Sequence, residues 1–366
     1  IYHYIYFFLV KLIFLQKFKF NMNKFHSLKI TEIKNLTYDS VEIVFDTNNH
    51  LFNFNSGQYI TIKHTINNED VRRAYSICSA PNEGLSIGVK LVQGGKMSTF
   101  LTSEVKIGDN LDVMPPAGNF VLNGDEKNII GICAGSGVTP IISMIKSELA
   151  KNTDSNFTLI YGNKSQDSAM FKDDLKVLEE NNSDRLKIHW AFSREGVSGA
   201  INGRVDKNTL QQLLNTFNAL KTADAYFICG PGELIDNANE LLLLNNINQA
   251  KINFERFTVV ELTDVADNDS DEIISNVMVS VDGEDFEFTL SNKGQTILDA
   301  AMEQGADVPF SCKGAVCCTC KARVMEGKVT MDANYSLSEE EVADGFILGC
   351  QARPASANVV VDFDEM

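Results

Sequence analysis

The sequence is poor in basic residues. It carries 32 Lys and Arg against 49 Asp and Glu, which gives a formal net charge of −17. A surface this acidic repels nucleic acid and anionic membranes, so neither is an expected partner. An acidic surface is compatible with a basic protein partner at low ionic strength, or it only keeps the protein in solution. The composition does not distinguish these two explanations. Internal repeats and low-complexity tracts are also lacking, which predicts an ordinary globular protein.

The sequence also lacks the paired C-x2-C units that are typical of zinc sites, because only Cys317 and Cys320 form one. Counted from Cys312, three cysteines run C-x4-C-x2-C, and Cys350 follows after a longer segment. This is the plant-type spacing for a [2Fe–2S] cluster held by four thiolates. A zinc knuckle and unrelated buried thiols are the alternatives. The predicted cluster ligands are Cys312, Cys317, Cys320 and Cys350.

No disulfide framework is indicated, since four of the eight cysteines are assigned to the cluster. Cys78, Cys133 and Cys229 stand singly in apolar segments, where buried thiols are common. Cys318 is expected to pack against the cluster loop. A reducing compartment follows, so we expect the protein in the cytoplasm.

The N-terminal stretch lacks the features of a targeting signal and of a full membrane span. Residues 1–20 are apolar and aromatic but are interrupted by three lysines. The run before Lys11 is too short to cross a bilayer, and no small-residue cleavage site follows. We set an N-terminal extension at residues 1–22, of which residues 1–21 are expected not to be native, with the natural start at Met22. A membrane anchor is the alternative.

The length of 366 residues predicts two or three domains. Short alternating apolar segments over 23–124 predict an antiparallel β-barrel. Apolar strands that alternate with helical periodicity over 125–257 predict a doubly wound α/β domain. Residues 258–275 are acidic and aperiodic, which predicts a linker. Residues 276–366 combine a hairpin, a helix, the cysteine loop and further strands, one of them over 347–351, which predicts an α+β domain of β-grasp type.

Three segments of the barrel domain favour a flavin dinucleotide. On a strand, Arg73 and Tyr75 share one face while Ser76 points the other way. An Arg side chain clamps a diphosphate, and a Tyr ring offers a flat face to a flavin. The glycine-rich turn at 94–99 leads into a helix whose free N–H groups suit a pyrophosphate. Phe120 ends a loop where its ring is expected to stack on an adenine. A surface cross-strand pair and plain turns are the alternatives.

Two glycine-rich turns follow predicted parallel strands. The turn that contains Gly135 and Gly137 opens a helix, at the position where a dinucleotide pyrophosphate meets a helix N-terminus. The turn that contains Cys229 and Gly230 lets a thiol and flexible backbone approach a nicotinamide ring. Either turn alone is weak evidence, and the pair on one sheet edge favours a nucleotide site.

Ser193 and Arg194 end another predicted strand. A hydroxyl beside a guanidinium suits the 2′-phosphate that distinguishes NADP from NAD. A solvated loop charge is the alternative for Arg194, so the pair alone leaves the nucleotide open.

Taken in order, residues 73–76, 134–140, 229–233 and the four predicted ligands resemble the ferredoxin–NADP reductase superfamily with a fused plant-type ferredoxin domain. The resemblance covers residues 25–366. Within that superfamily, the chain is similar to the reductase subunits of phenylacetyl-CoA epoxidases. The segments that carry this closer likeness are 25–28, 157–163, 313–321, 331–337 and 359–364.

The resemblance implies FAD, NADPH and one [2Fe–2S] cluster as cofactors. The residues that it places on the flavin are Arg73, Tyr75, Ser76 and Ser98, with Phe257 near the flavin face. The residues that it places beside the nicotinamide are Thr139, Cys229 and Gly230, and those on the 2′-phosphate are Ser193 and Arg194. Ser76 and Cys229 are expected to orient the flavin and the nicotinamide for hydride transfer. A second basic phosphate-binding position is not clearly matched, so the preference for NADPH over NADH is not settled by the sequence.

These expectations describe a route of electrons from NADPH to FAD, then to the cluster, and on to a di-iron oxygenase that acts on phenylacetyl-CoA. A nicotinamide gives two electrons together, a cluster accepts one at a time, and a flavin handles both. One alternative is a reductase of the phthalate dioxygenase reductase type, with FMN and NADH. A second is a non-enzymatic iron–sulfur carrier or sensor that has lost nicotinamide turnover.

Overall fold

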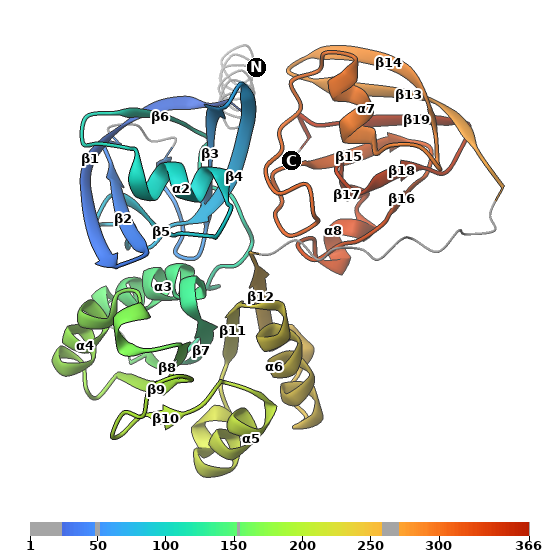
Figure 1. Cartoon of the computed structure of the whole chain (residues 1–366). Helices are drawn as coiled ribbons and strands as arrows, with labels where there is room; N and C mark the ends of the chain where they lie inside the picture. Colours follow the sequence, from blue (N-terminus) through green and yellow to red (C-terminus); the bar gives the residue numbers. More distant parts are fainter. Residues whose placement is uncertain (1–23, 48–51, 152–153, 258–270, 366) are drawn as a thin grey trace, which may run out of the picture. The chain divides into compact units, whose positions relative to one another are not determined.

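The computed structural model describes residues 24–47, 52–151, 154–257 and 271–365 (Figure 1). The expected N-terminal extension and most of the expected acidic linker lie outside these residues. The chain divides into two compact units, which consist mainly of residues 27–258 and 259–366. The first unit holds both the barrel and the α/β sheet.

The barrel is a six-stranded antiparallel sheet in the order β4-β3-β6-β1-β2-β5. An antiparallel bridge between Ile77 and Ile87 links the chain after β4 to β5, at the two ends of this order. Alternate side chains of the strands point into the barrel interior, which confirms the predicted barrel. Its elements are β1 (His26–Thr37), β2 (Ser40–Phe45), β3 (Tyr59–Ile66), β4 (Glu69–Ser76), β5 (Leu85–Lys90), α2 (Lys96–Ser103) and β6 (Asn110–Val113).

The α/β sheet has the order β10-β9-β8-β7-β11-β12, and its strand pairs are parallel. Helices α3 and α4 contribute to the core on one face, and α5 and α6 to the core on the other, which confirms the doubly wound architecture (Figure 1). The strands are β7 (Asn128–Ala134), β8 (Asn156–Asn163), β9 (Leu186–Phe192), β10 (Ile201–Asn202), β11 (Ala225–Gly230) and β12 (Ile252–Arg256). The helices are α3 (Val138–Ala150), α4 (Lys172–Asn181), α5 (Lys207–Thr216) and α6 (Gly232–Leu244).

The order of the strands reverses at β7. The chain proceeds from β7 through β8 and β9 to β10, and then returns to place β11 on the other side of β7. Parallel α/β sheets bind ligands at such a switch point, outside the carboxyl ends of the strands. A short 3₁₀ turn, η2 (Gly135–Gly137), connects β7 to α3 at this point.

The barrel and the α/β sheet share packed and hydrogen-bonded contacts. The Ser143 hydroxyl of α3 donates to the Ser79 carbonyl oxygen at 2.6 Å, and both residues are buried. A Cβ atom on Gly88 of β5 would lie 2.5 Å from the Thr139 methyl group, so glycine is needed where these elements meet.

The second unit is a five-stranded sheet in the order β14-β13-β19-β15-β17, whose core includes helix α7. This arrangement confirms the predicted α+β domain. Its elements are β13 (Ile274–Val281), β14 (Glu284–Ser291), α7 (Ile297–Glu303), β15 (Lys321–Glu326), β16 (Val329–Met331), α8 (Glu339–Ala343), β17 (Phe346–Leu348), β18 (Ala352–Pro354) and β19 (Asn358–Asp362).

Two details of this unit differ from the sequence prediction. The strand expected over 347–351 ends at Leu348, because the Gln351 N–H donates to the Leu348 carbonyl oxygen at 2.8 Å and closes a turn that contains Cys350. Strand β13 begins at Ile274, inside the segment expected to be linker.

No helix among the described residues is long and apolar enough to cross a membrane.

Gly57 gives a stability prediction for the first unit. It has a φ of +99°, and a Cβ atom there would lie 1.9 Å from the Phe120 carbonyl oxygen and 2.5 Å from the Met144 methyl group. Gly84 has a similar φ of +89° but open space around it, so it serves as the matched control. We expect Gly57→Ala to destabilise the unit by about 1–3 kcal/mol more than Gly84→Ala, because only the first adds overpacking to backbone strain.

Urea unfolding followed by fluorescence of Trp190, the single tryptophan, measures this difference in the unit that contains both glycines. Equal losses in the two variants would contradict the packing account and leave backbone strain as the whole effect.

Candidate functional site

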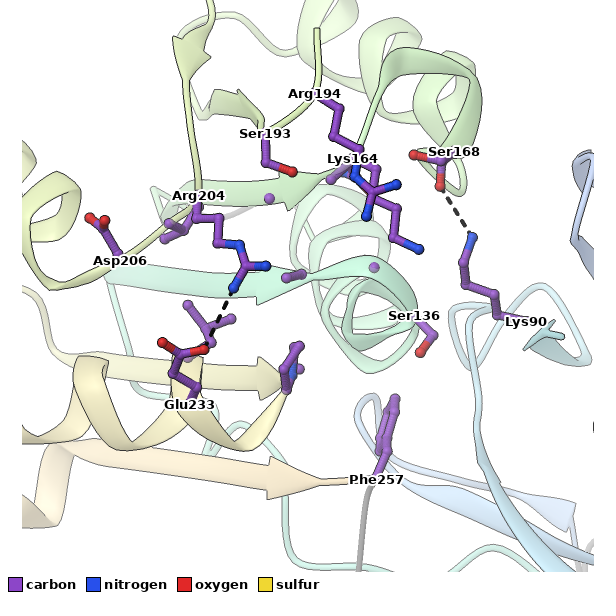
Figure 2. Close-up of a pocket in the computed structure, with 18 of the residues that line it drawn as sticks. Lys90, Ser136, Lys164, Ser168, Ser193, Arg194, Arg204, Asp206, Glu233 and Phe257 are labelled. Carbon is purple, nitrogen blue, oxygen red and sulfur yellow. Dashed lines mark hydrogen bonds and ion pairs between the residues drawn. The ribbon is translucent and has the colours of Figure 1, made fainter. Parts of the chain in front are cut away.

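A cavity of about 550 Å³ lies at the carboxyl ends of β7, β8, β9 and β11, at the switch point of the sheet (Figure 2). The sheet contributes the turns that follow its strands, and the barrel contributes one wall. The lining residues that carry charge are Asp39, Lys90, Lys164, Arg194, Arg204, Asp206 and Glu233.

The cavity floor depends on how closely the two glycine turns approach each other. Gly135 has a φ of +57°, which favours glycine. A Cβ atom on Gly137 would lie 2.2 Å from the Cys229 carbonyl oxygen, so only glycine lets η2 pack against the end of β11. Gly230 completes the second turn with a φ of +153°. Both turns therefore reach the same edge, as expected from their positions after parallel strands.

Three basic side chains line the cavity near β9, and the acidic Asp206 and Glu233 line it as well. Arg194 follows β9, and Lys164 follows the neighbouring β8 (Figure 2). Arg204 enters from the segment between β10 and α5, because β10 pairs in parallel with β9. The Arg204 guanidinium lies 3.7 Å from the Glu233 carboxylate, and both side chains are 76% exposed. An ion pair this exposed contributes little to stability, so Arg204 remains available to a ligand.

Lys90 of the barrel lines one side of the cavity. Its ammonium group donates to the Asp39 carboxylate at 2.7 Å. It also donates to the Ser168 carbonyl oxygen at 3.3 Å (Figure 2). Partial burial alone would raise the pKa of Asp39, but the hydrogen bonds from Lys90 and Thr37 lower it below its usual range. Asp39 is therefore charged at neutral pH, and Lys90 ties the barrel to the α/β domain beside the cavity.

Asn163 shows that the cavity suits a polar ligand. Its side chain is buried at the end of β8, and neither its amide oxygen nor its amide nitrogen has a hydrogen-bond partner among the described residues. Buried amides are costly to leave unpaired, so a bound group with its own donors and acceptors would complete the site. A nicotinamide dinucleotide has this chemistry.

The structure brings five of the expected nucleotide and flavin residues to the cavity wall: Gly135, Ser193, Arg194, Gly230 and Phe257. Thr139 and Cys229 lie beneath the wall instead. The Thr139 hydroxyl donates to the Ser136 carbonyl oxygen at 2.9 Å, and its side chain is 1% exposed. Burial raises the pKa of the Cys229 thiol well above its usual range, so this thiol stays protonated.

The expectation for Phe120 is wrong in its geometry. The ring was expected to stand at a loop and stack on an adenine. It is 6% exposed and packs edge-on against Phe227 with ring centroids 5.2 Å apart, inside the core shared by the barrel and the sheet. The loop turns inward because the chain runs on from Phe120 toward β7, and burial of the ring stabilises that junction.

The expected flavin residues lie on β4 and α2. Arg73 is exposed and donates to the Arg72 carbonyl oxygen at 2.7 Å, while burial raises the pKa of Tyr75 well above its usual range. Helix α2 has no side-chain cap at its N-terminus. Ser98 accepts a hydrogen bond from the Val92 N–H at 3.1 Å, which fixes the turn that precedes the helix. Free N–H groups at the start of a helix fit the pyrophosphate of a flavin dinucleotide.

No pattern in the sequence indicates a role for Glu255 on β12. It accepts a hydrogen bond from the Ser76 hydroxyl at 3.1 Å, although the two residues are 179 positions apart. Removal from water raises the pKa of Glu255 to about 8, against the smaller opposing effect of Ser76. The carboxyl group therefore holds a proton at neutral pH, which a carboxylic acid in water does not. Only the contact between the barrel and the sheet reveals this pair.

The four predicted cluster ligands gather in the second unit. The Cys312 and Cys317 sulfurs are 3.2 Å apart, and Cys350 contacts the sulfurs of Cys312 and Cys320. Lys313 and Ala315 have positive φ values of 49° and 62°, which curl the loop around these thiols.

Neighbouring groups favour a thiolate within this cluster of thiols. Hydrogen bonds from Cys317 and Cys350, with further ones from the Gly314 and Val316 N–H groups, lower the pKa of Cys312 well below its usual range, and the same contacts with Cys312 raise the pKa of Cys317 and Cys350. No group of three or more His, Cys, Asp or Glu side chains in the described ranges has the geometry for a single metal ion. A [2Fe–2S] core is larger than one ion, and each of its irons takes only two of the four thiolates.

A second segment braces the cluster loop. The Tyr335 N–H donates to the Ala315 carbonyl oxygen at 3.1 Å, and the Ser336 hydroxyl donates to the Cys317 carbonyl oxygen at 3.1 Å. The Cys318 thiol donates back to the Ser336 carbonyl oxygen at 3.2 Å. Cys318 therefore packs against the loop as expected, and the donor set and the braced loop fit an iron–sulfur cluster.

Three family models match successive parts of the chain. Residues 27–122 match the oxidoreductase FAD-binding domain, 132–240 the oxidoreductase NAD-binding domain, and 279–355 the 2Fe-2S iron-sulfur cluster binding domain. These matches, the cavity and the gathered thiols define a class of protein: flavin and iron–sulfur oxidoreductases that bind a nicotinamide nucleotide.

The relatives are components of oxygenase systems. The chain is 38% identical over 356 residues to a 1,2-phenylacetyl-CoA epoxidase subunit from Escherichia coli (strain K12), with 94% of this chain and 99% of that protein covered. It is 31% identical over 350 residues to the ferredoxin reductase component of 3-ketosteroid-9-alpha-monooxygenase from Rhodococcus rhodochrous, with 92% and 96% covered. The solved structure of phthalate dioxygenase reductase is 25% identical, with 92% and 98% covered and a TM-score of 0.57.

The chain therefore belongs to the ferredoxin–NADP reductase superfamily, in the family of electron-transfer reductases with a fused [2Fe–2S] domain that includes the epoxidase subunit.

Glu255 gives a pH-dependence prediction. Its pKa in the folded chain, about 8, lies above the ordinary value of 4.5, so its contribution to stability is present below about pH 4.5 and is lost as the pH rises toward 8. We expect the unfolding free energy of the parent to fall with pH in this window more steeply than that of Glu255→Gln, by at most about 1.4 kcal/mol per pH unit.

Urea unfolding at half-unit steps from pH 5 to pH 8.5 measures the difference, with the exposed Glu180→Gln on α4 as the control that keeps the parent profile. Parallel profiles for the parent and Glu255→Gln would show that Glu255 is already ionised at pH 5.

Proposed function

We propose that this chain is the NADPH-dependent reductase component of a di-iron oxygenase that acts on phenylacetyl-CoA. The observation that carries the proposal is its likeness to the epoxidase subunit over 99% of that protein's length, at 38% identity. The cytoplasm is the proposed location, in keeping with eight cysteines that all lie among the described residues and form no disulfide there.

When bound, the nicotinamide supplies a hydride, the flavin accepts the pair and releases electrons singly, and the cluster carries one electron at a time. The protein's part is to hold these groups and to exclude competing chemistry. On this proposal, Cys312, Cys317, Cys320 and Cys350 hold the cluster.

The preference for NADPH rests on cations at one end of the cavity. Arg194 and Arg204 both line that end, with the Ser193 hydroxyl beside them. A 2′-phosphate is a dianion at neutral pH, and guanidinium groups bind such groups through paired hydrogen bonds. Arg204 supplies the second basic position that the sequence alone did not reveal. Glu233 pairs with Arg204, and a bound phosphate would compete for that guanidinium group.

The proposed flavin contacts come from the barrel. Arg73 and the N-terminus of α2 would hold the pyrophosphate, and Tyr75 would offer its ring to the flavin. The hydrogen-bonded Ser76 hydroxyl and Glu255 carboxyl group would together hold a proton near the flavin. Cys229 acts through packing, because its thiol is buried and protonated. Phe257, which follows β12 and is 41% exposed, would lie near the flavin face.

Two substitutions test the nucleotide preference. We expect Arg194→Ala and Arg204→Ala each to lower kcat/KM for NADPH by about tenfold, the effect of one charge-assisted hydrogen bond, and to leave kcat/KM for NADH nearly unchanged. Steady-state reduction of ferricyanide measures both values.

Lys207→Ala is the matched control, since it removes a positive charge from the same domain outside the cavity. A parent enzyme that prefers NADH, or an equal loss with both nucleotides, would reject the 2′-phosphate assignment and retain the nucleotide site.

Reconstitution tests the proposed partner. We expect the purified holoprotein, mixed with the oxygenase subunits of a phenylacetyl-CoA epoxidase and NADPH, to support epoxide formation detected by mass spectrometry. Cys320→Ser is expected to keep NADPH-dependent ferricyanide reduction through the flavin but to lose more than about 90% of epoxide formation, because one of the cluster ligands is missing.

Brisk ferricyanide reduction by the parent without epoxide would reject the partner and keep the reductase. Acid extraction of the flavin tests the alternative suggested by the likeness to phthalate dioxygenase reductase, since FMN in place of FAD would favour that alternative. Failure of both NADPH and NADH to bleach the flavin would favour an electron carrier or sensor.

A further inference from the structure

Gln351 follows the fourth cluster ligand directly, and its side chain turns back onto that ligand. Its amide nitrogen lies 3.6 Å from the Cys350 sulfur and 2.8 Å from the Cys350 carbonyl oxygen, and both contacts have hydrogen-bond geometry. The side chain is 7% exposed, so water does not compete well for the same donors. A neutral amide with two N–H groups can serve both acceptors at once.

The backbone of Gln351 is fixed on both sides. Its N–H donates to the Leu348 carbonyl oxygen at 2.8 Å, and its carbonyl oxygen accepts from the Asp332 N–H at 3.0 Å. The Asp332 carboxylate is held in turn by the Arg353 guanidinium at 2.8 Å. The amide of Gln351 therefore has a defined position relative to Cys350.

The domain around it is strongly acidic. Residues 271–366 contain 18 Asp and Glu against six Lys and Arg. Negative charge near a cluster opposes the addition of an electron, whereas an N–H donor aimed at a ligand sulfur favours it. Hydrogen bonds to the sulfurs, net charge and solvent exposure are the protein's means of setting the reduction potential.

We propose that Gln351 is a positioning and tuning residue of the [2Fe–2S] site: its side-chain N–H bonds to the Cys350 sulfur and raises the reduction potential of the cluster. The reduced cluster carries one more negative charge than the oxidised one, so the hydrogen bond stabilises the reduced state more. The amide partly offsets the acidic surroundings and makes the cluster a better acceptor for electrons that leave the flavin. The inference rests on the chain holding the cluster that its family match assigns.

The test is a redox titration of the full-length holoprotein, with the reduced cluster counted by its paramagnetic resonance signal. At a fixed solution potential, we expect Gln351→Leu to lower the reduced-to-oxidised ratio roughly three- to tenfold, the effect of one lost hydrogen bond. A tenfold change corresponds to about 59 mV for one electron. Gln351→Glu is expected to lower the ratio further, because it adds a carboxylate in place of the donors.

Gln304→Leu is the matched control. Gln304 is exposed after the end of α7 in the same domain, so the same chemical change there is expected to leave the potential unchanged. A Gln351→Leu protein with full iron content, an unchanged signal intensity and the parent's potential would overturn the proposal.

A second measurement needs no substitution and stands even if Gln351→Leu fails to load its cluster. Pulsed paramagnetic resonance of the reduced parent, labelled with ¹⁵N in glutamine side chains, is expected to show coupling to a side-chain amide nitrogen. Absence of that coupling in a sample with a normal cluster signal would overturn the proposal, whatever the variants do. A protein without any cluster signal would instead refute the iron–sulfur assignment on which the inference rests.

Discussion

The nucleotide cavity depends on one close approach of backbone to backbone. Gly137 lies so near the Cys229 carbonyl group that any side chain would intrude to 2.2 Å. This contact joins the turn after β7 to the end of β11, on the two sides of the point where the strand order reverses. Once the two turns meet, the carboxyl ends of four strands form one edge, and the side chains that follow those strands face a common space. The charged side chains of the cavity wall and the unpaired amide of Asn163 lie at the cavity because the strands end at that edge.

Local patterns in the sequence were enough for the architecture and for part of the site. Alternation, glycine turns and cysteine spacing predicted the barrel, the doubly wound sheet and the β-grasp domain, because each is a short-range signal. Ser193 and Arg194 were also predictable, since they follow a strand directly. Lys164 follows β8 in the same way, so its place in the cavity wall could have been predicted from its position after that strand. Arg204 could not be predicted in this way, because it reaches the cavity after β10, a two-residue strand that is too short to show periodicity in the sequence.

Long-range contacts account for the remaining differences. Glu255 and Ser76 are 179 positions apart, and nothing near either residue predicts their hydrogen bond or the raised pKa of the carboxyl group. Phe120 looked like a loop aromatic because its neighbours are turn formers, yet the junction of barrel and sheet buries its ring. In each case, the missing information was the packing of one domain on the other, which no window of sequence contains.

The shared wall between barrel and α/β domain has a consequence for protein engineering. Lys90 and Asp39 belong to the barrel, yet they line the cavity, and Lys90 binds Ser168 across the junction. The junction also contains the Ser143–Ser79 hydrogen bond. In a chimera that takes its nucleotide domain from another reductase, the barrel residues at the cavity wall would therefore not match the new domain. The exchanged segment would need to include the β1–β2 hairpin and the end of β5, so it is larger than the α/β domain.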